Sequence, residues 1–409
     1  IRQGIVPEGY KKGKIGIVPI KWNEVPFSTL FTSTSEYTDD LKQYPLYSLT
    51  IEDGITAKTE RYERSHLVKK ENSYKVVRPN DYAYNPMNIR FGAVARHKGD
   101  IPVAVSGYYD IFTTVHESDL VFMDSFLTYG PMITYYNKVS TGSLVEKQRV
   151  HFSDFLEFSL ALPPLEERKK IAEILATQDK AIELQGRKIE ELKRFKKGCL
   201  EKMFPRKGQK VPEKRFPGFT GDWEQRKVGD ITIESTEYLT LDSGLPLFTS
   251  SRNGLLYQNE YRGNVTTNNK QTLFSVVPLG ACTYRHMSDD DVFHLNINTI
   301  EKGLVSREYP VFCGTPNHDI VFIVQHINSS KAFRAFCAEQ KMGGTRTRLY
   351  YKALCEFTMM VPSFAEQRRI SKFLLNIDHL ITLHQRKLEE MKRQKKALMQ
   401  LLLTGIVRI

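Results

Sequence analysis

Cysteine is scarce in this chain of 409 residues, which contains only five, an odd number, with none in a Cys-x-x-Cys pair. This usage indicates neither a disulfide framework nor a zinc site, so we expect the reducing cytoplasm as the compartment. No apolar run approaches the roughly 18 residues that cross a bilayer. The start of the chain lacks the apolar core of a signal peptide. Ile1 stands where an initiator methionine would, so we expect a short leader to be missing.

Catalytic motifs are also lacking. The sequence has no G-x-x-x-x-G-K-[ST] phosphate loop, no H-E-x-x-H and no G-x-S-x-G. Residues 84–88, YNPMN, only partly resemble the Asn-Pro-Pro-aromatic motif of adenine methyltransferases, and a chance turn explains them better. Asp289, Asp290 and Asp291 could bind a divalent cation, although three adjacent loop carboxylates more often face water. We therefore expect no catalytic site and no metal site in this chain.

What the chain does contain is a long internal repeat. Residues 163–204 recur at 362–403 without a gap when the register is shifted by 199 residues. The two copies begin PPLEERKKIAEIL and PSFAEQRRISKFL, and they continue RKIEELKRFKKG and RKLEEMKRQKKA. A repeat of this length indicates a protein built from two copies of one unit.

Each copy of the repeat is predicted to form one uninterrupted helix. A proline precedes each copy, acidic residues fall in the first turn and lysines and arginines fill the later turns, an order that suits the helix dipole. Apolar residues recur at alternating steps of four and three, the heptad pattern of a coiled coil. The alternative, a solvated helix on a globular core, is disfavoured by the length. The apolar seam comprises Ile171, Leu175, Ile182, Ile189, Leu192, Ile370, Leu374, Ile381, Leu388 and Met391.

The segments that precede the two helices also repeat each other, at a spacing close to 200 residues. Short β-rich runs with turn signals and one or two helices indicate an α+β fold. PLYSLT at 45–50 matches PLFTSS at 246–251, and Asp53-Gly54 matches Asn253-Gly254. Between these anchors the two segments differ strongly, which suggests two sites that recognise different things. We predict a globule at 1–160, a helix at 161–204, a linker at 205–220, a globule at 221–358 and a helix at 359–404.

A formal net charge of +12 favours a polyanionic partner. Arginine, lysine, hydroxyl and amide side chains gather on predicted loops, where they suit phosphates and base edges. The sharpest example is GGTRTR at 343–348, with two glycines for close backbone approach. In the first globule the candidate DNA contacts are Thr50, Tyr84, Asn85, Arg90, Arg96, Lys138, Thr141, Ser143, Lys147 and Arg149. In the second globule they are Ser251, Arg252, Asn253, Tyr284, Arg285, His286, Thr345, Arg346 and Arg348.

With these features together, the chain resembles the specificity subunit of type I restriction–modification systems over essentially its full length. The resemblance rests on the doubled helix starts and their continuations, PLFTSSRNG, GGTRTRLYY and the linker KRFPGFTGDWEQRKVGDI. It implies an α+β fold in which two similar α/β target recognition domains are separated by two long antiparallel coiled-coil helices, as a pseudo-two-fold internal repeat.

The resemblance also implies a function without catalysis. Each target recognition domain would read one half of a bipartite, asymmetric target in double-stranded DNA. The two helices would set the spacing and dock two methylation subunits through the seam residues, and two restriction subunits would join the full complex. S-adenosylmethionine would belong to the methylation subunits, and ATP and Mg²⁺ to the restriction subunits, with no cofactor in this chain. Two other readings remain: a coiled-coil adaptor that binds only proteins, and a self-contained nuclease or methyltransferase.

Overall fold

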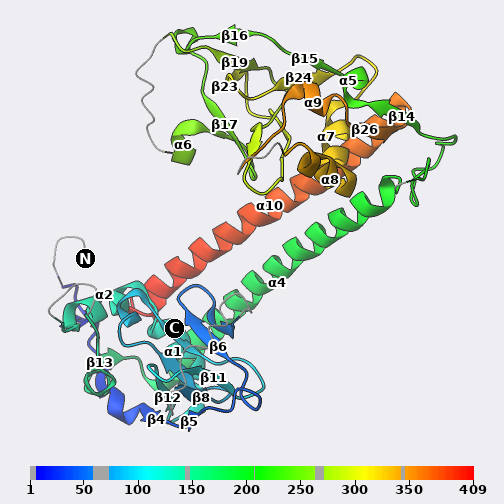
Figure 1. Cartoon of the computed structure of the whole chain (residues 1–409). Coiled ribbons are helices and arrows are strands. Elements are labelled where there is room, and N and C mark those ends of the chain that lie inside the picture. Colours follow the sequence, from blue (N-terminus) through cyan, green and yellow to red (C-terminus); the bar gives the residue numbers. More distant parts are fainter. Residues whose placement is uncertain (1–5, 59–72, 143–147, 207, 263–270, 342–345) are drawn as a thin grey trace. The chain divides into compact units, whose positions relative to one another are not determined.

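The computed structural model describes residues 6–58, 73–142, 148–206, 208–262, 271–341 and 346–409 (Figure 1). It forms two compact units. One comprises Ile1–Gly186 with Arg386–Ile409, and the other comprises Arg187–Gln385. Each unit contains one globule together with part of each of two long helices. We call residues 6–162 the first globule and residues 221–361 the second globule.

The first globule is built from short antiparallel strands. Its strands are β1 (Tyr10–Gly13), β2 (Gly16–Pro19), β3 (Asn23–Pro26), β4 (Phe31–Ser33), β5 (Tyr37–Thr38), β6 (Tyr47–Thr50), β7 (Gly54–Ala57), β8 (Tyr74–Val77), β9 (Tyr82–Tyr84), β10 (Val94–Arg96), β11 (Val103–Ser106), β12 (Asp110–Thr114) and β13 (Ser159–Leu162). They form a four-stranded sheet β10-β9-β12-β4, a three-stranded sheet β11-β8-β5, and the pairs β1-β2, β6-β7 and β13-β3. The helices are α1 (Leu120–Phe126), α2 (Gly130–Val139) and α3 (Phe152–Leu156), with 3-10 turns η1 (Phe27–Thr29), η3 (Ile89–Phe91) and η4 (Glu117–Asp119).

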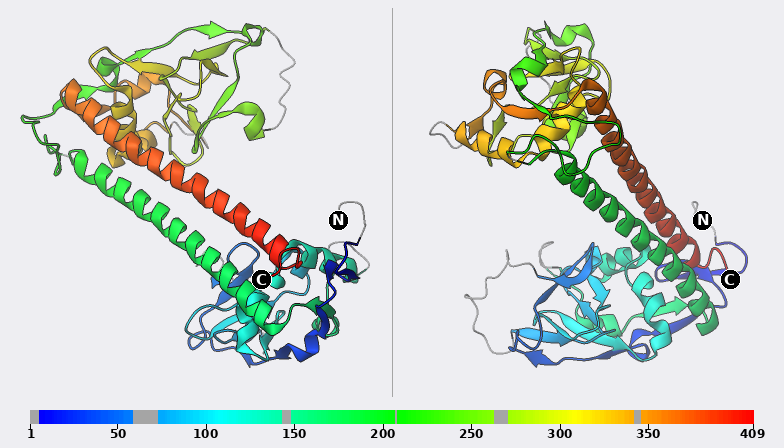
Figure 2. Two further views of the ribbon diagram at one scale, coloured as in Figure 1. Left: turned by 180° about the vertical axis from the view of Figure 1, so that it is seen from behind. Right: turned by 90° about the vertical axis from the view of Figure 1, so that its right-hand side faces the viewer.

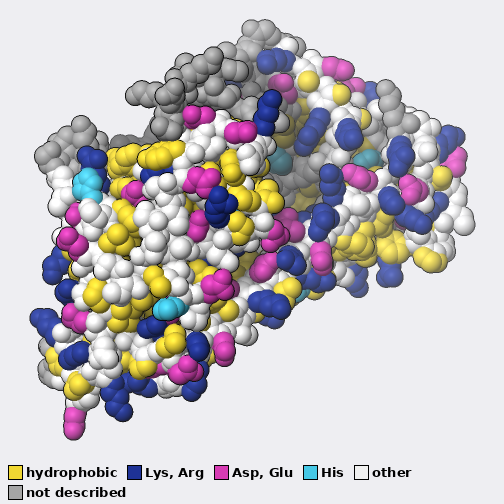
Figure 3. Space-filling model, turned by 90° about the horizontal axis from the view of Figure 1, so that it is seen from below, with side chains coloured by type: hydrophobic (Ala, Val, Ile, Leu, Met, Phe, Trp, Pro, Cys, Tyr) yellow, Lys and Arg dark blue, Asp and Glu magenta, His cyan; other side chains and the backbone are white. Residues whose placement is uncertain are grey.

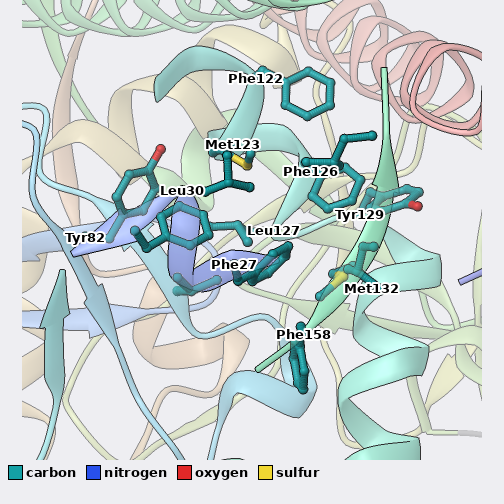
Figure 4. Packing of buried hydrophobic residues seen from close by; sticks show 14 of the residues in the cluster. Phe27, Leu30, Tyr82, Phe122, Met123, Phe126, Leu127, Tyr129, Met132 and Phe158 are labelled. Carbon is teal, nitrogen blue, oxygen red and sulfur yellow. The ribbon is translucent and has the colours of Figure 1, made fainter. Parts of the chain in front are cut away.

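Aromatic rings dominate the core of the first globule (Figure 4). Phe27 meets Phe155 edge to face with ring centroids 5.0 Å apart, and Tyr82 stacks on Phe112 at 5.1 Å. These offset and edge contacts are the arrangements that aromatic pairs prefer, and each large ring buries much apolar surface. The core therefore holds the four-stranded sheet and helices α1 and α2 together as one body. The loops project from this body.

The second globule repeats this plan. Its strands are β14 (Glu224–Lys227), β15 (Thr232–Glu234), β16 (Tyr238–Leu239), β17 (Phe248–Ser251), β18 (Gly254–Tyr257), β19 (Phe274–Val277), β20 (Cys282–Thr283), β21 (Met287–Ser288), β22 (Asn296–Ile297), β23 (Gly303–Ser306), β24 (Val311–Gly314), β25 (Thr347–Arg348) and β26 (Thr358–Val361). The sheets β22-β20-β24-β15 and β23-β19-β16 match β10-β9-β12-β4 and β11-β8-β5 strand for strand. Its helices are α5 (Val228–Ile231), α6 (Gln258–Arg262), α7 (Ile320–Ser329), α8 (Lys331–Glu339) and α9 (Tyr351–Leu354), with the 3-10 turn η6 (Leu241–Ser243). The α+β fold and its internal repeat are confirmed.

The two long helices are α4 (Leu165–Met203) and α10 (Phe364–Leu402), each of 39 residues. They lie side by side and antiparallel within each unit (Figure 2). In the first unit Lys395 Nζ lies 2.5 Å from Asp179 Oδ1, and in the second Lys196 Nζ lies 2.8 Å from Asp378 Oδ1. Both partners of one pair are displaced by 199 residues from those of the other. The predicted pair of long helices is therefore confirmed.

A buried carboxylate near the start of each long helix binds a distant arginine. Glu167 accepts hydrogen bonds from Arg408 at 2.5 and 2.8 Å and from the Trp22 indole at 3.3 Å. Glu366, only 1% exposed, accepts two from Arg215, both 2.7 Å long. Such bidentate, charge-assisted hydrogen bonds are among the strongest that side chains form. Each pair ties the segment that follows one helix to the start of the other helix, within one unit.

Replacing Arg215 by alanine leaves the Glu366 carboxylate buried without its cation, so Arg215→Ala should lower the free energy of unfolding of the second unit by roughly 3 kcal/mol. Adding Glu366→Gln should restore part of this loss, because the buried charge is then gone. Urea unfolding followed by the fluorescence of Trp223, in a Trp22→Phe background, measures the change. The matched control, Lys227→Ala, breaks an exposed pair with Glu356 of equal length, 2.7 Å, and should leave the midpoint unchanged. Equal midpoints for Arg215→Ala and the control would contradict this assignment.

His326 makes the second unit sensitive to acid. Its ring is buried against Phe204, with ring centroids 4.6 Å apart, and burial lowers its pKa to about 4. An unfolded histidine binds its proton below about pH 6.5. Stability should therefore fall as the pH drops from about 6.5 to 4, by roughly 3 kcal/mol, and level off below that range. His326→Phe should remove most of this slope in unfolding experiments, whereas His379→Gln, at an exposed position of α10, should retain it. An unchanged slope in His326→Phe would mean that another group is responsible.

Candidate nucleic-acid interface

The hairpin β6–β7 of the first globule presents an exposed, acidic tip. The Thr50 hydroxyl closes its turn, accepting a hydrogen bond from the Asp53 backbone N–H at 3.1 Å and donating to the Gly54 carbonyl at 3.3 Å. Gly54 has a φ of +67° and lies against Ala95, where an added Cβ would be 3.2 Å from the alanine Cβ. The turn therefore requires glycine there. Glu52 and Asp53 at the tip face solvent.

A cleft of about 640 Å³ lies beside this hairpin. The hairpin, the loop that follows β10, and helices α1 and α2 line it. Its charged lining mixes both signs, with Glu52, Asp53, Asp100 and Asp124 against Arg96 and Lys98. Carboxylates outnumber the cations in this cleft, so its charge does not favour a phosphate.

Arg96, a predicted DNA contact, is engaged within the fold. Its guanidinium donates from Nε and Nη2 to Asp124 at 2.8–3.2 Å and from Nη1 to Asn80 at 2.6 Å. The Tyr82 hydroxyl donates to the same carboxylate at 2.8 Å, and burial together with that carboxylate raises the pKa of Tyr82 well above its usual value. In the matching places of the second globule stand Ile297 and Val324, an apolar pair. Arg96 thus makes a structural contact that the other globule makes with hydrophobic side chains.

Three further candidates of the first globule also serve its own structure. Tyr84 is fully buried, and its hydroxyl donates to the Val150 carbonyl at 2.9 Å, so it offers no surface to a duplex. Asn85 is buried and accepts hydrogen bonds from the Met87 and Asn88 backbone N–H groups at 3.1 and 3.3 Å. Arg90 donates to Gln148 at 2.7 Å.

The exposed candidates of the first globule gather at the end of α2. Lys138 lies in the last turn of that helix, and Thr141 and Arg149 exchange two backbone hydrogen bonds of 2.9 Å. All three side chains are exposed. Ser143 and Lys147 lie outside the described residues. This group can offer two cations and a hydroxyl to a phosphate backbone.

The matching hairpin β17–β18 of the second globule has a turn that is one residue shorter, and a different tip. The Ser251 hydroxyl donates to the Gly254 carbonyl at 2.9 Å and accepts from the Asn253 backbone N–H at 3.1 Å, so a hydroxyl closes this turn as well. Asn296 braces the hairpin by donating to Ser250 Oγ at 2.7 Å and to the Ser251 carbonyl at 2.8 Å. Arg252 and Asn253 are exposed at the tip.

Asp289 and Asp290 are exposed to water, as expected, and all three aspartates also have partners within the protein. Asp289 accepts a hydrogen bond from Arg346 Nε at 2.7 Å, and Asp290 pairs with Arg252 Nη2 at 2.5 Å. Asp291 accepts a hydrogen bond from the Thr347 hydroxyl. A hydrogen bond from Ser288 and the neighbouring Arg252 lower the pKa of Asp290. Protein groups thus hold all three carboxylates.

Of the remaining second-globule candidates, Tyr284 and His286 are buried. The Tyr284 hydroxyl donates to the Leu349 carbonyl at 3.1 Å, so this side chain belongs to the core. His286 stacks on Tyr350 with ring centroids 5.3 Å apart, and burial lowers its pKa. Arg285 and Arg348 are exposed, the latter on β25 opposite Met287. Thr345 lies outside the described residues.

The apolar seam of the long helices faces the interior. Ile171 and Leu175 belong to the first core and Ile370 and Leu374 to the second. Ile189 is buried too, and Ile182, Leu192, Ile381, Leu388 and Met391 are partly buried. The seam pattern marks the face that packs inside the chain, so most of it is not available to another protein.

A different set of apolar side chains faces outward on these helices. Leu165 and Leu184 of α4 are exposed, and so are Phe364 and Leu383 of α10, at positions 199 residues later. The heptad pattern did not reveal them, because they fall off the seam. They could have been identified because an apolar residue stands, in both copies of the repeat, at a position on the otherwise charged face of the helix.

Basic and acidic side chains are interspersed on the face of the molecule seen in Figure 3. Among the described residues, no group of three or more His, Cys, Asp or Glu side chains could hold a metal ion. No helix in the same part of the chain is long and apolar enough to cross a membrane.

A family model for the type I restriction modification DNA specificity domain matches residues 124–194 and again residues 306–393. A putative type I restriction enzyme MjaX specificity subunit of Methanocaldococcus jannaschii is 23% identical, over 98% of this chain and 97% of its own length. The MjaVIII specificity subunit of the same organism is 23% identical over 62% of this chain and 63% of its own length.

Two solved structures share the fold. The type I restriction–modification S subunit of M. genitalium aligns with a TM-score of 0.58 and 12% identity, over 96% of this chain and 99% of that one. A chain from a study of complex assembly and conformational transition of the type I restriction–modification system aligns with a TM-score of 0.52 and 15% identity, over 95% and 99%. The doubled domain match, the end-to-end relative and the shared fold agree with the repeat seen in the structure. The chain therefore contains two matches to the DNA specificity domain of type I restriction–modification systems and shares the fold of a specificity subunit of these systems.

Proposed function

We propose that this chain is a specificity subunit of a type I restriction–modification system, in which each globule reads one half of a bipartite, asymmetric target in double-stranded DNA. The observation that supports this most directly is the contrast between the two matching hairpins. A hydroxyl closes each turn, that of Thr50 in one and of Ser251 in the other, yet one tip carries Glu52 and Asp53 and the other, one residue shorter, carries Arg252 and Asn253. Two equal scaffolds with unlike tips suit two unlike half-sites, since base contacts specify a sequence and phosphate contacts position the duplex.

A set of exposed or half-buried basic and polar side chains makes the contacts that we propose for DNA. The described ones are the half-buried Thr50 and the exposed Lys138, Thr141, Arg149, Arg252, Asn253, Arg285, Arg346 and Arg348, and the earlier expectations for Ser143, Lys147 and Thr345 join them. Each phosphate that a lysine or arginine neutralises releases counterions, so binding should weaken steeply with salt. Tyr84, Tyr284 and Arg96 are left out because the fold itself uses them.

We further propose that the long helices set the distance between the half-sites and dock two methylation subunits, with two restriction subunits joining the full complex. A helix of 39 residues is about 58 Å long, more than one turn of B-DNA, which is roughly 34 Å. The exposed apolar pair Leu165 and Leu184 recurs as Phe364 and Leu383, which offers the same surface twice. Two copies of one partner require such a repeated surface.

Chemistry belongs to the partners in this proposal. S-adenosylmethionine binds the methylation subunits, and ATP with Mg²⁺ binds the restriction subunits. The work of this chain is to select where they act, in the bacterial cytoplasm where the DNA lies.

Exchanging residues 221–361 for the corresponding globule of a relative should change one half-site and leave the other intact. This exchange keeps the paired strands β14 and β26 together, so the new globule retains its closing strand pair. The reconstituted complex with methylation subunits modifies plasmid DNA, and sequencing of the modified adenines gives the target. If both half-sites change together, independent reading by the two globules is wrong. Exchanging residues 6–162 is the reciprocal control.

Leu184→Asp and Leu383→Asp should each remove one methylation subunit from the complex. A charge in a buried apolar contact forfeits the roughly 1.5–3 kcal/mol of burying a leucine, and this lowers the affinity of one site by at least 10-fold. Native mass spectrometry should show a stoichiometry of two falling to one in each variant and to none in the double variant. Leu279→Asp, at an exposed leucine away from the helices, is the control and should retain two. Two bound subunits in the double variant would refute this docking surface.

A further inference from the structure

Two arginines of the second globule are held by carboxylates from consecutive residues. Arg252, at the tip of the β17–β18 hairpin, pairs through Nη2 with Asp290 at 2.5 Å. Arg346, just before β25, pairs through Nε with Asp289 at 2.7 Å. The arginine side chains are 63% and 55% exposed, so both present their remaining N–H donors to solvent. Segments that are far apart in the sequence thus bring two guanidinium groups to one place.

Asp290 and its neighbour Asp291 are held by hydroxyl groups of strands β21 and β25. The Ser288 hydroxyl, buried in β21, donates to Asp290 at 2.8 Å and accepts from the Val292 backbone N–H at 3.1 Å. Asp291 has a φ of +60°, in the left-handed region that few residues other than glycine adopt, and accepts from the fully buried Thr347 hydroxyl. Strand β21 pairs with β25, which contains Thr347. The turn is therefore anchored at both ends to the sheet, which limits the freedom of Asp290 and Asp291 and fixes the backbone that carries Asp289.

An arginine paired in this way is poorly suited to bind a phosphate. The adjacent carboxylate cancels much of its charge and repels an anion, and an exposed cation without such a partner would bind the DNA backbone better. The same pairing suits a neutral base edge. It orients the planar guanidinium, lowers the entropy lost on binding, and leaves parallel N–H donors for a pair of acceptors. In the major groove guanine offers such a pair, O6 and N7.

We propose that Asp290 and Asp289 orient Arg252 and Arg346 to read guanine in the half-site of the second globule. Arg252 and Arg346 contact the bases, and the two aspartates are positioning residues. This inference rests on the proposed function, since it assigns base chemistry to one of the two reading surfaces. The matching hairpin of the first globule carries Glu52 and Asp53 at its tip, so the first half-site is read by different chemistry.

The test uses the full chain reconstituted with its methylation subunits, and the readout is the sequence of the modified sites. Arg252→Ala and Arg346→Ala should each relax one G·C pair, at different positions of the second half-site, with discrimination falling about 10-fold or more. Asp290→Asn should relax the same position as Arg252→Ala, and Asp289→Asn the same position as Arg346→Ala. The first half-site should stay unchanged in all four variants.

Lys302→Ala and Glu237→Gln are the matched controls. They break an ion pair of the same globule that is similarly exposed, with 3.2 Å between Lys302 Nζ and Glu237 Oε1, and should leave the target unchanged. Thermal unfolding of each chain excludes a loss of fold, since exposed pairs contribute little to stability.

Several outcomes would overturn the inference. One is an unchanged target in both arginine variants, and another is a second half-site without a G·C pair. A third is that Asp290→Asn and Asp289→Asn bind unrelated duplexes more tightly while the modified target sequence stays the same. The aspartates would then only neutralise the arginine charge. A wild-type complex that modifies no bipartite sequence would instead refute the proposed function, so the two failures are distinguishable.

Discussion

A buried carboxylate near the start of each long helix is the constraint on which the rest of the structure depends. Glu167 and Glu366 lie in helix positions where the dipole favours negative charge, and each is neutralised by an arginine that follows the other helix, Arg408 or Arg215. A carboxylate taken out of water without a cation would cost several kcal/mol. The fold of each unit therefore requires residues from two distant parts of the chain, and a single helix with its globule would lack this partner.

Because the sheets satisfy their own backbone hydrogen bonds, the tips of the hairpins and the loops beside them are free to differ. The two globules share their strand order and the use of a hydroxyl to close the hairpin turn. They differ in side-chain contacts: Arg96 binds Asp124 in the first globule, and the apolar Ile297 and Val324 stand at the matching positions of the second. Ile297 and Val324 both belong to the second core, so in this globule the strand and the helix are joined by hydrophobic packing instead. Recognition can thus diverge at the tips while the frame stays constant.

The sequence was most informative where a period or a repeat expresses one physical requirement. Apolar residues at heptad spacing must be buried, so the long helices could be predicted, and the recurrence of Asp53-Gly54 as Asn253-Gly254 marked matching places in the two globules. Burial of single side chains could not be predicted. Tyr84 ends strand β9 and Tyr284 follows strand β20, where a surface residue might stand, yet their hydroxyls donate to buried carbonyls. Ion pairs such as Asp289 with Arg346 join residues far apart in sequence, which no local pattern reveals.

The pairing of arginine with aspartate bears on how a chain of charge +12 achieves selectivity. Uncompensated cations bind every duplex alike, since phosphates are the same at every step, and they raise affinity without discrimination. Covering a cation with a carboxylate removes much of that general attraction and keeps the directional donors. Discrimination is a difference of affinities, so weakening the contacts common to all sequences helps as much as strengthening those to one. Arg252 and Arg346 are each paired with an aspartate, whereas no salt bridge joins Lys138 or Arg149, at the end of α2, to another residue that the structure describes. On our proposal, cations of the first kind would read bases and those of the second kind would supply general binding.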